Sequence, residues 1–158
     1  GLAPPRGASF DPRTLFTSMF NHQLSIFMSA RERIDSVLVD IEGVVLASLF
    51  DEEIRAARTL LEAAQVRSAG AMAAVVLAHH LKGVCTHARA LPSPERPTIA
   101  DFGDALKSKG LVDLSGWRFL RHLATIADLC LHTRDREPSA AEVDDLIRGV
   151  QRAQGMVF

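Results

Sequence analysis

Three residues in the C-terminal half of the chain could carry out acid–base chemistry. Arg121, Asp128 and His132 are separated by seven and four residues, which on a straight helix places them on one stripe within about 40°. An imidazole titrates near neutrality and can transfer a proton, and Asp128, one turn earlier, could orient it. Arg121 would lie about 16 Å from His132 along the axis, so both could contact one phosphate only across a dimer interface.

The same residues also have a simpler interpretation. An Asp–His pair at i, i+4 is a common exposed helix contact that stabilises a helix by about 0.2–0.5 kcal/mol. The charged turn at 133–139 follows directly and contains Arg134 and Arg136. This turn is either a solvated connection between helices or, next to His132, a small cationic binding site for phosphate.

Other catalytic and metal-binding patterns are missing from the sequence. His79 and His80 are adjacent, which points them about 100° apart on a helix, and His87 lies two turns beyond His80. There is no Cys-x-x-Cys or His-Glu-x-x-His spacing, no glycine-rich phosphate loop and no Gly-x-Ser-x-Gly elbow. We therefore expect no metal and no cofactor. Cys85 and Cys130 are expected to be reduced and buried.

The elements that position these residues are all predicted to be helices, in one all-α bundle. Apolar residues recur at helical spacing throughout, and Pro-rich residues 91–97 form the clearest break. Helices are expected to start at Asp11-Pro12, Ser29, Asp51, Ser68, Thr98, Ser115 and Ser139, the last with Glu142 in capping-box position. An end or bend is expected near Gly43, and stops at Ala64, Ala90 and Lys109-Gly110.

One stretch also has strand character. Residues 37–50 are rich in Val and Ile, and "VLVDIEGVVL" resembles the first motif of haloacid-dehalogenase phosphatases. Glu42 stands where that motif has its second aspartate, and no alternation of strands and helices follows. The helical interpretation is therefore preferred.

Size and charge limit the possible classes of protein. A chain of 158 residues and 17.2 kDa fits one domain, which we place at 13–158, with residues 1–12 as a loose segment or tag remnant. A formal charge of −1 excludes a chain held to nucleic acid by bulk charge. The longest apolar run, 69–78, is about half of a membrane span. We expect a cytoplasmic protein without internal repeats or a coiled coil.

Three segments together resemble a known family of helical domains. They are "ARTLLEAAQVRSAGAMAAVVLAHHLKGVC", "TIADFGDALKSKG" and "IADLCLHTRDREPSAAEVDDLIRGV", and over about 46–155 they are similar to bacterial HEPN-like domains. The resemblance implies a small helical bundle that dimerises. Active HEPN domains are metal-independent ribonucleases whose Arg–polar–x3–His motif brings arginine and histidine of two protomers together at the dimer cleft.

The motif carries over only in part. His132 matches the family histidine, but Ala127 stands at the arginine position, Asp128 at the polar position and Ala78 where an acidic residue is common. RNA cleavage develops negative charge on the phosphate, which a fixed guanidinium stabilises and Asp128 would oppose. The resemblance therefore predicts a catalytically degenerate interaction or regulatory module, a homodimer through the face of Asp128 and His132, with RNA or a protein as its partner.

Two alternatives remain open. One is an active metal-independent homodimeric ribonuclease, a toxin or defence effector, with His132 as general acid/base, Asp128 beside it and a displaced arginine. Arg121, Arg134 and Arg136 are the candidates for that arginine. The other is a helical adaptor joined at its N-terminus to a larger effector.

Overall fold

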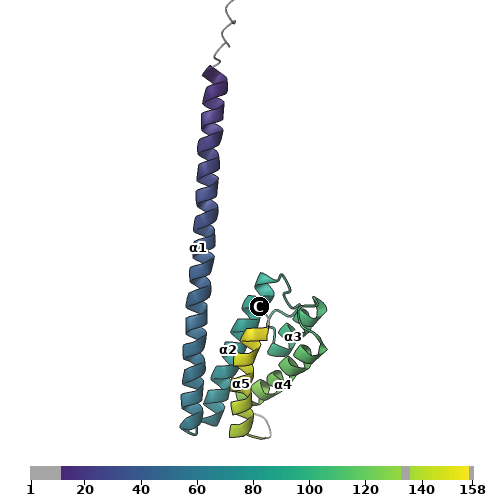
Figure 1. Cartoon of the computed structure of the whole chain (residues 1–158). Helices are drawn as coiled ribbons and strands as arrows, with labels where there is room; N and C mark the ends of the chain where they lie inside the picture. Colours follow the sequence, from purple (N-terminus) through teal and green to yellow (C-terminus); the bar gives the residue numbers. More distant parts are fainter. Residues whose placement is uncertain (1–11, 133–135, 157–158) are drawn as a thin grey trace, which may run out of the picture. The chain divides into compact units, whose positions relative to one another are not determined.

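The computed structural model describes residues 12–132 and 136–156, and all regular structure in them is helical. This confirms the predicted all-α class. The helices are α1 (Pro12–Glu62), α2 (Val66–His87), α3 (Ile99–Ser108), α4 (Leu114–Leu131) and α5 (Ala140–Met156) (Figure 1). The proposed loose or tag segment at 1–12 lies outside the described residues, except that Pro12 begins α1.

Helix α1 is much longer than the sequence predicted. It runs from Pro12 to Glu62 without interruption, so the predicted boundaries at Ser29, Gly43 and Asp51 are wrong. Ser and Asp inside a helix cost only about 0.5–0.7 kcal/mol each relative to Ala, and Gly about 1 kcal/mol. A residue that can cap a helix therefore marks a helix end only where the backbone also departs from helical geometry. Residues 37–50, for which a strand was the alternative, are also helical, so the strand interpretation is wrong.

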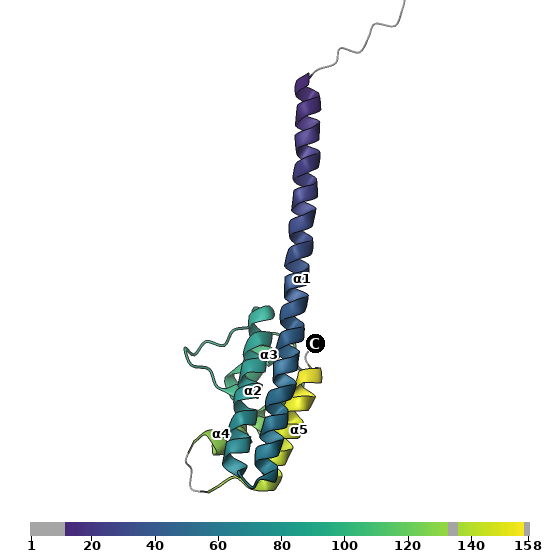
Figure 2. The same ribbon diagram turned by 90° about the vertical axis from the view of Figure 1, so that its left-hand side faces the viewer.

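The contacts divide the chain into two compact units, residues 1–46 and 47–158, which we call unit 1 and unit 2. Among its described residues, unit 1 consists of the first part of α1. Unit 2 contains the rest of α1 and helices α2 to α5. The end of α1 runs beside α5 (Figure 2), where Arg58 donates a hydrogen bond to Gln151 at 3.4 Å.

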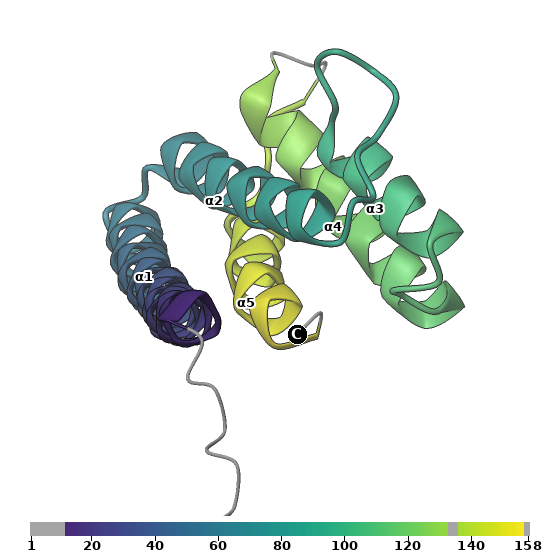
Figure 3. The same ribbon diagram turned by 90° about the horizontal axis from the view of Figure 1, so that it is seen from above.

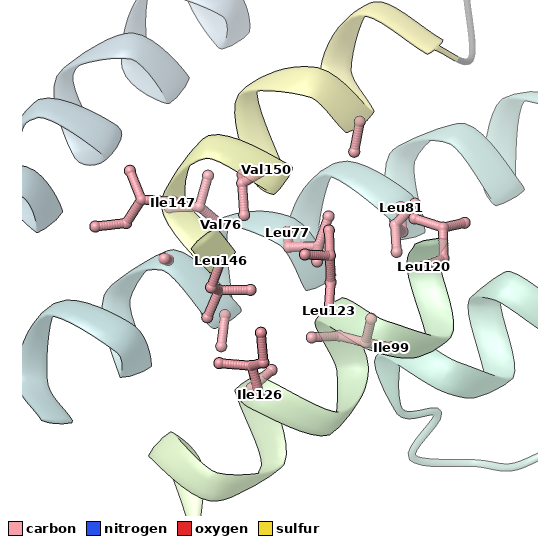
Figure 4. Packing of buried hydrophobic residues seen from close by; sticks show 14 of the residues in the cluster. Val76, Leu77, Leu81, Ile99, Leu120, Leu123, Ile126, Leu146, Ile147 and Val150 are labelled. Carbon is pink, nitrogen blue, oxygen red and sulfur yellow. The ribbon is translucent and has the colours of Figure 1, made fainter. Parts of the chain in front are cut away.

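Helix α2 is central to the packing of unit 2. It contacts α3, α4 and α5, and α4 also packs on α3 and α5; Figure 3 shows these helices gathered against α2. The core lies where they meet (Figure 4) and includes Val76, Leu77, Leu81, Ile99, Leu120, Leu123, Ile126, Leu146, Ile147 and Val150. Small residues on α2, such as Gly70 and Ala73, are also buried and permit close approach of helices.

Side-chain caps set the starts of α3, α4 and α5, whereas α2 begins at Val66, two residues before the predicted Ser68, without a side-chain cap. Thr98 and Asp101 form a capping box at the start of α3, and Gly110 follows its end with a φ of 71°. Ser139 and Glu142 form the predicted box before α5. The cap of α4 was misplaced, because Asp113 and not Ser115 accepts the amide hydrogen bond, from Gly116 at 2.7 Å.

The two cysteines and the apolar helix occupy the same core. Cys85 and Cys130 are free and buried, as predicted. By length and composition, α2 is the one candidate for a membrane-spanning helix among the described residues. Half of its apolar window is buried within the fold, and a buried core helix passes the same test. This finding is therefore weak evidence for a membrane span.

Candidate functional site

His132 lies at the point where α4 ends. Its backbone is extended (φ −120°, ψ 144°), and its amide donates the last helical hydrogen bond to the Asp128 carbonyl at 3.1 Å. The ring Nε2 lies 3.5 Å from Asp128 Oδ1, and both side chains are about half exposed or more. The four-residue spacing thus brings the predicted acid–base pair together on the surface.

Arg121 does not belong to this pair. Its guanidinium lies 3.7 Å from the Asp104 carboxylate on α3 and 5.6 Å from the centre of the Trp117 ring. Asp104 also accepts a hydrogen bond from the Trp117 indole at 2.6 Å. Arg121 therefore takes part in the α3–α4 contact, and within one protomer it cannot share a phosphate with His132.

Arg67, in the first turn of α2, is the residue at this site that sequence reasoning missed. Its Nη1 donates to the backbone carbonyls of Leu129, Cys130 and His132 at 3.0, 3.3 and 3.0 Å. Carbonyls at a helix end lack partners within the helix and carry partial negative charge, so a guanidinium there is favourable. Arg67 thereby fixes the end of α4 and the backbone of His132 to α2.

The same guanidinium is neutralised by an acidic residue. Glu137 receives a hydrogen bond from Arg67 Nε at 2.9 Å, and its other oxygen lies 2.8 Å from Nη2. This contact lowers the pKa of Glu137 and raises that of Arg67. Both groups are therefore charged at neutral pH, and Arg67 is held in a two-pronged ion pair.

Arg136 is engaged in a similar way. It donates to both oxygens of Glu142, at 2.9 and 2.6 Å, while Glu142 also accepts from the Ser139 amide at 2.9 Å. The Arg136 hydrogen bonds, followed by those of Ser139, lower the pKa of Glu142 to about 2. Arg134, the other residue proposed to bind phosphate, lies outside the described residues.

The arginine position of the resembled motif lies in the core. Ala127 is only 1% exposed and belongs to the core cluster of unit 2. Arg67 contacts the His132 carbonyl, Arg136 follows His132 by four residues, and each of these two guanidinium groups is paired with a carboxylate. The site therefore offers an accessible imidazole next to compensated charges, with an exposed apolar Leu131 beside it.

Replacing Glu142 by Gln should change how stability depends on pH. The folded pKa of about 2 lies below the ordinary value of 4.5, so the ionised form stabilises the fold above pH 4.5. That stabilisation is lost as pH falls towards 2. Glu142→Gln should lower the free energy of unfolding at neutral pH and flatten its decline between pH 4.5 and 2, measured by urea unfolding with Trp117 fluorescence. Glu95→Gln is the control, and an unchanged slope in Glu142→Gln would contradict the assignment.

A second histidine–carboxylate pair was not predicted. His122 Nε2 on α4 lies 2.7 Å from Asp145 Oδ2 on α5, and both side chains are more than half exposed. The partners are 23 residues apart on different helices, so no spacing rule within one helix could find them. This pair is shorter than His132–Asp128 and provides an internal control for experiments on His132.

Comparisons with known proteins add no further constraint on the site. No family model matches the chain, and neither the curated proteins nor the solved structures include a match.

Proposed function

We propose that unit 2 is a HEPN-like interaction or regulatory module that has lost ribonuclease activity. The observation that carries this proposal is the charge pairing around His132. Arg67 and Arg136 are both bound to carboxylates of the chain itself, and a buried alanine occupies position 127.

The chemical argument concerns the charge that develops during RNA cleavage. Preorganised donors directed at the phosphate contribute much of the catalysis in such reactions, and removal of one typically costs about 100- to 1,000-fold in rate. Arg67 Nη1 is occupied by three carbonyl oxygens, and Arg136 by both oxygens of Glu142. A phosphate would have to displace these partners and would also meet the Asp128 carboxylate.

The module is proposed to act as a homodimer through the face of Asp128 and His132. Support comes from Leu131, a large apolar side chain that is 46% exposed next to this pair. In protein interfaces, apolar side chains typically lie at the centre and polar side chains at the rim. RNA or a second protein would then bind to the dimer as a regulatory partner.

One observation favours the alternative of an active ribonuclease. The His132 imidazole is exposed and lies 3.5 Å from Asp128, an arrangement that suits a general acid/base. This function would need an arginine from the partner protomer or from the segment that contains Arg134.

Cleavage of single-stranded RNA in EDTA separates the two functions. The wild type is compared with His132→Ala and with His122→Ala. The second variant removes an exposed imidazole on α4 that is paired with an aspartate on α5. The proposed module cleaves no more than a buffer blank in any form. Cleavage that is lost in His132→Ala and kept in His122→Ala would establish the ribonuclease instead.

A further inference from the structure

Unit 1 presents an unusual number of large apolar side chains to solvent. Within residues 13–45 the side chains with relative exposures of 48% to 73% are Phe16, Met19, Phe20, Leu24, Ile26, Phe27, Met28, Ile34, Val37, Ile41, Val44 and Val45. A helix in water normally covers such residues against other elements of its own fold. A surface of this kind marks an interaction site.

Seven of these twelve residues follow a seven-residue repeat, although no coiled coil was expected from the sequence. The predicted helix boundaries at Ser29 and Gly43 divided the repeat, whereas α1 continues through both positions. Phe20, Phe27, Ile34 and Ile41 succeed one another at intervals of seven. The residues three positions after each of these, together with the residue four positions before Phe20, form the second line of the repeat: Phe16, Gln23, Ala30, Val37 and Val44. We call these nine residues the heptad stripe. Apolar residues alternating at spacings of three and four over about four heptads are typical of a coiled coil.

The face opposite the heptad stripe is mostly polar, with Met28 as an exposed apolar residue on it. Between the turns of the heptad stripe it carries Ser18, His22, Ser25, Ser29, Glu32 and Ser36. Arg31 and Asp35 form an exposed ion pair at 3.9 Å, one turn apart. The other exposed apolar residues, Met19, Leu24, Ile26 and Val45, lie at the heptad positions that flank the stripe. The apolar surface is therefore wider than the stripe, and a partner would cover its centre.

We propose that a second copy of this chain covers the heptad stripe, forming a parallel, in-register coiled coil. A seven-residue repeat is complementary to itself, because each position meets the same position of the other chain. In this register Gln23 faces Gln23 of the second copy, so the polar group in the stripe has a polar partner. A single polar residue at such a position sets the register of coiled coils.

The area available matches that of a stable interface. Phe16, Phe20 and Phe27 are 73%, 58% and 69% exposed, and a phenylalanine can bury about 150–250 Å². With the four aliphatic residues of the stripe, each chain offers roughly 700 Å². Two chains would thus bury roughly 1,400 Å², within the standard range of about 1,200–2,000 Å².

A lipid surface fits this helix less well than a second copy does. Helices that lie in the membrane interface are rich in Lys and Arg on the polar face. Residues 13–45 contain no lysine and three arginines, against four acidic residues, and the face opposite the stripe carries mainly serines with His22 and Glu32. The charge pattern therefore lacks attraction to anionic headgroups.

The molecular mass in solution tests the proposal. Ile34→Glu places a charge in the heptad stripe, whereas the matched control Met28→Glu alters an exposed apolar residue outside it. Light scattering on the 158-residue chain should show Ile34→Glu with half the mass of the wild type and Met28→Glu with an unchanged mass. The same comparison is made in an Asp128→Arg background, which removes the dimer interface proposed for unit 2. The halving is expected there because two chains held together through both interfaces would keep their mass when only one interface is lost. A monomeric wild type, or an unchanged mass for Ile34→Glu in the Asp128→Arg background, would overturn the proposal.

Two further measurements fix the register and the nature of the partner. Ala30→Cys lies in the stripe and should form an intermolecular disulfide on mild oxidation, whereas Ser29→Cys, one residue away on the polar face, should not. Equal cross-linking of both variants would overturn the parallel register, and co-sedimentation of monomeric protein with phosphatidylglycerol vesicles would overturn the second copy as the partner. Asp128→Arg reports separately on the dimer proposed for unit 2.

Discussion

Replacing Ala127 by Arg is expected to destabilise unit 2 severely and to create no ribonuclease. The change rebuilds the Arg–polar–x3–His sequence at 127–132, but Ala127 is 1% exposed and lies in the core. A charge placed there has no carboxylate arranged to receive it, and an uncompensated buried charge costs about 3–5 kcal/mol. A domain of this size is stable by about 5–15 kcal/mol, so the variant should lose a large fraction of its stability and unfold at a much lower urea concentration.

Asp128→Asn is the matched control for this experiment. It restores a neutral polar residue at the second motif position, on a side chain that is 46% exposed. Loss of its exposed contact with His132 should cost less than about 1 kcal/mol. Urea unfolding followed by Trp117 fluorescence, with an RNA-cleavage assay on the same samples, measures both outcomes. A stable Ala127→Arg protein that cleaves RNA would show that position 127 reaches an accessible site.

Leu123→Ala is expected to have a similarly large effect on stability. Leu123 is fully buried at the contact of α4 with α5. Removing a buried leucine side chain leaves a cavity and typically costs about 2–5 kcal/mol. The unfolding midpoint in urea should fall accordingly, without a change in helix content of the folded protein.

The residue opposite Leu123 allows a sharper version of this test. A Cβ at Gly149 would lie 2.3 Å from Leu123 Cδ2, so Gly149→Ala alone should be destabilising by about 1–3 kcal/mol. In the double variant the clashing atoms are gone and the new methyl group fills part of the cavity. The double variant should thus be at least about 1 kcal/mol more stable than the sum of the single effects predicts.

Leu106→Ala provides the control pair. Leu106 is also fully buried but lies on α3, which makes no packing contact with α5 among the described helices. Its effect should add to that of Gly149→Ala within about 0.5 kcal/mol. Additive behaviour of Leu123→Ala with Gly149→Ala would mean that these two residues do not pack against each other as described.

The parts of the fold that were predicted correctly depend on local interactions. The capping box of Ser139 and Glu142 and the glycine after α3 each involve residues within a few positions of one another. The length of α1 could not be predicted in this way. Ser29 and Asp51 are good caps, but the cost of leaving them inside a helix is small, and packing of Phe50 and Ile54 in the core favours its continuation.

In the candidate site, too, local contacts could be predicted from the sequence and tertiary contacts could not. The contact of His132 with Asp128 follows from a spacing of four residues. Arg67 is 65 residues from His132, and only the packing of α2 against α4 brings it there. The pairing of Arg136 with Glu142 crosses the turn before α5, so the sequence identified both residues without linking them. The pairing of arginines with carboxylates, on which the proposed function rests, therefore depends on tertiary structure.

The most direct test of the proposed function is RNA cleavage in EDTA by wild-type protein whose oligomeric mass is recorded on the same sample. We expect a folded oligomer that cleaves single-stranded RNA no faster than the buffer blank and no faster than His132→Ala. Cleavage by the wild type that disappears in His132→Ala but persists in His122→Ala would contradict the account.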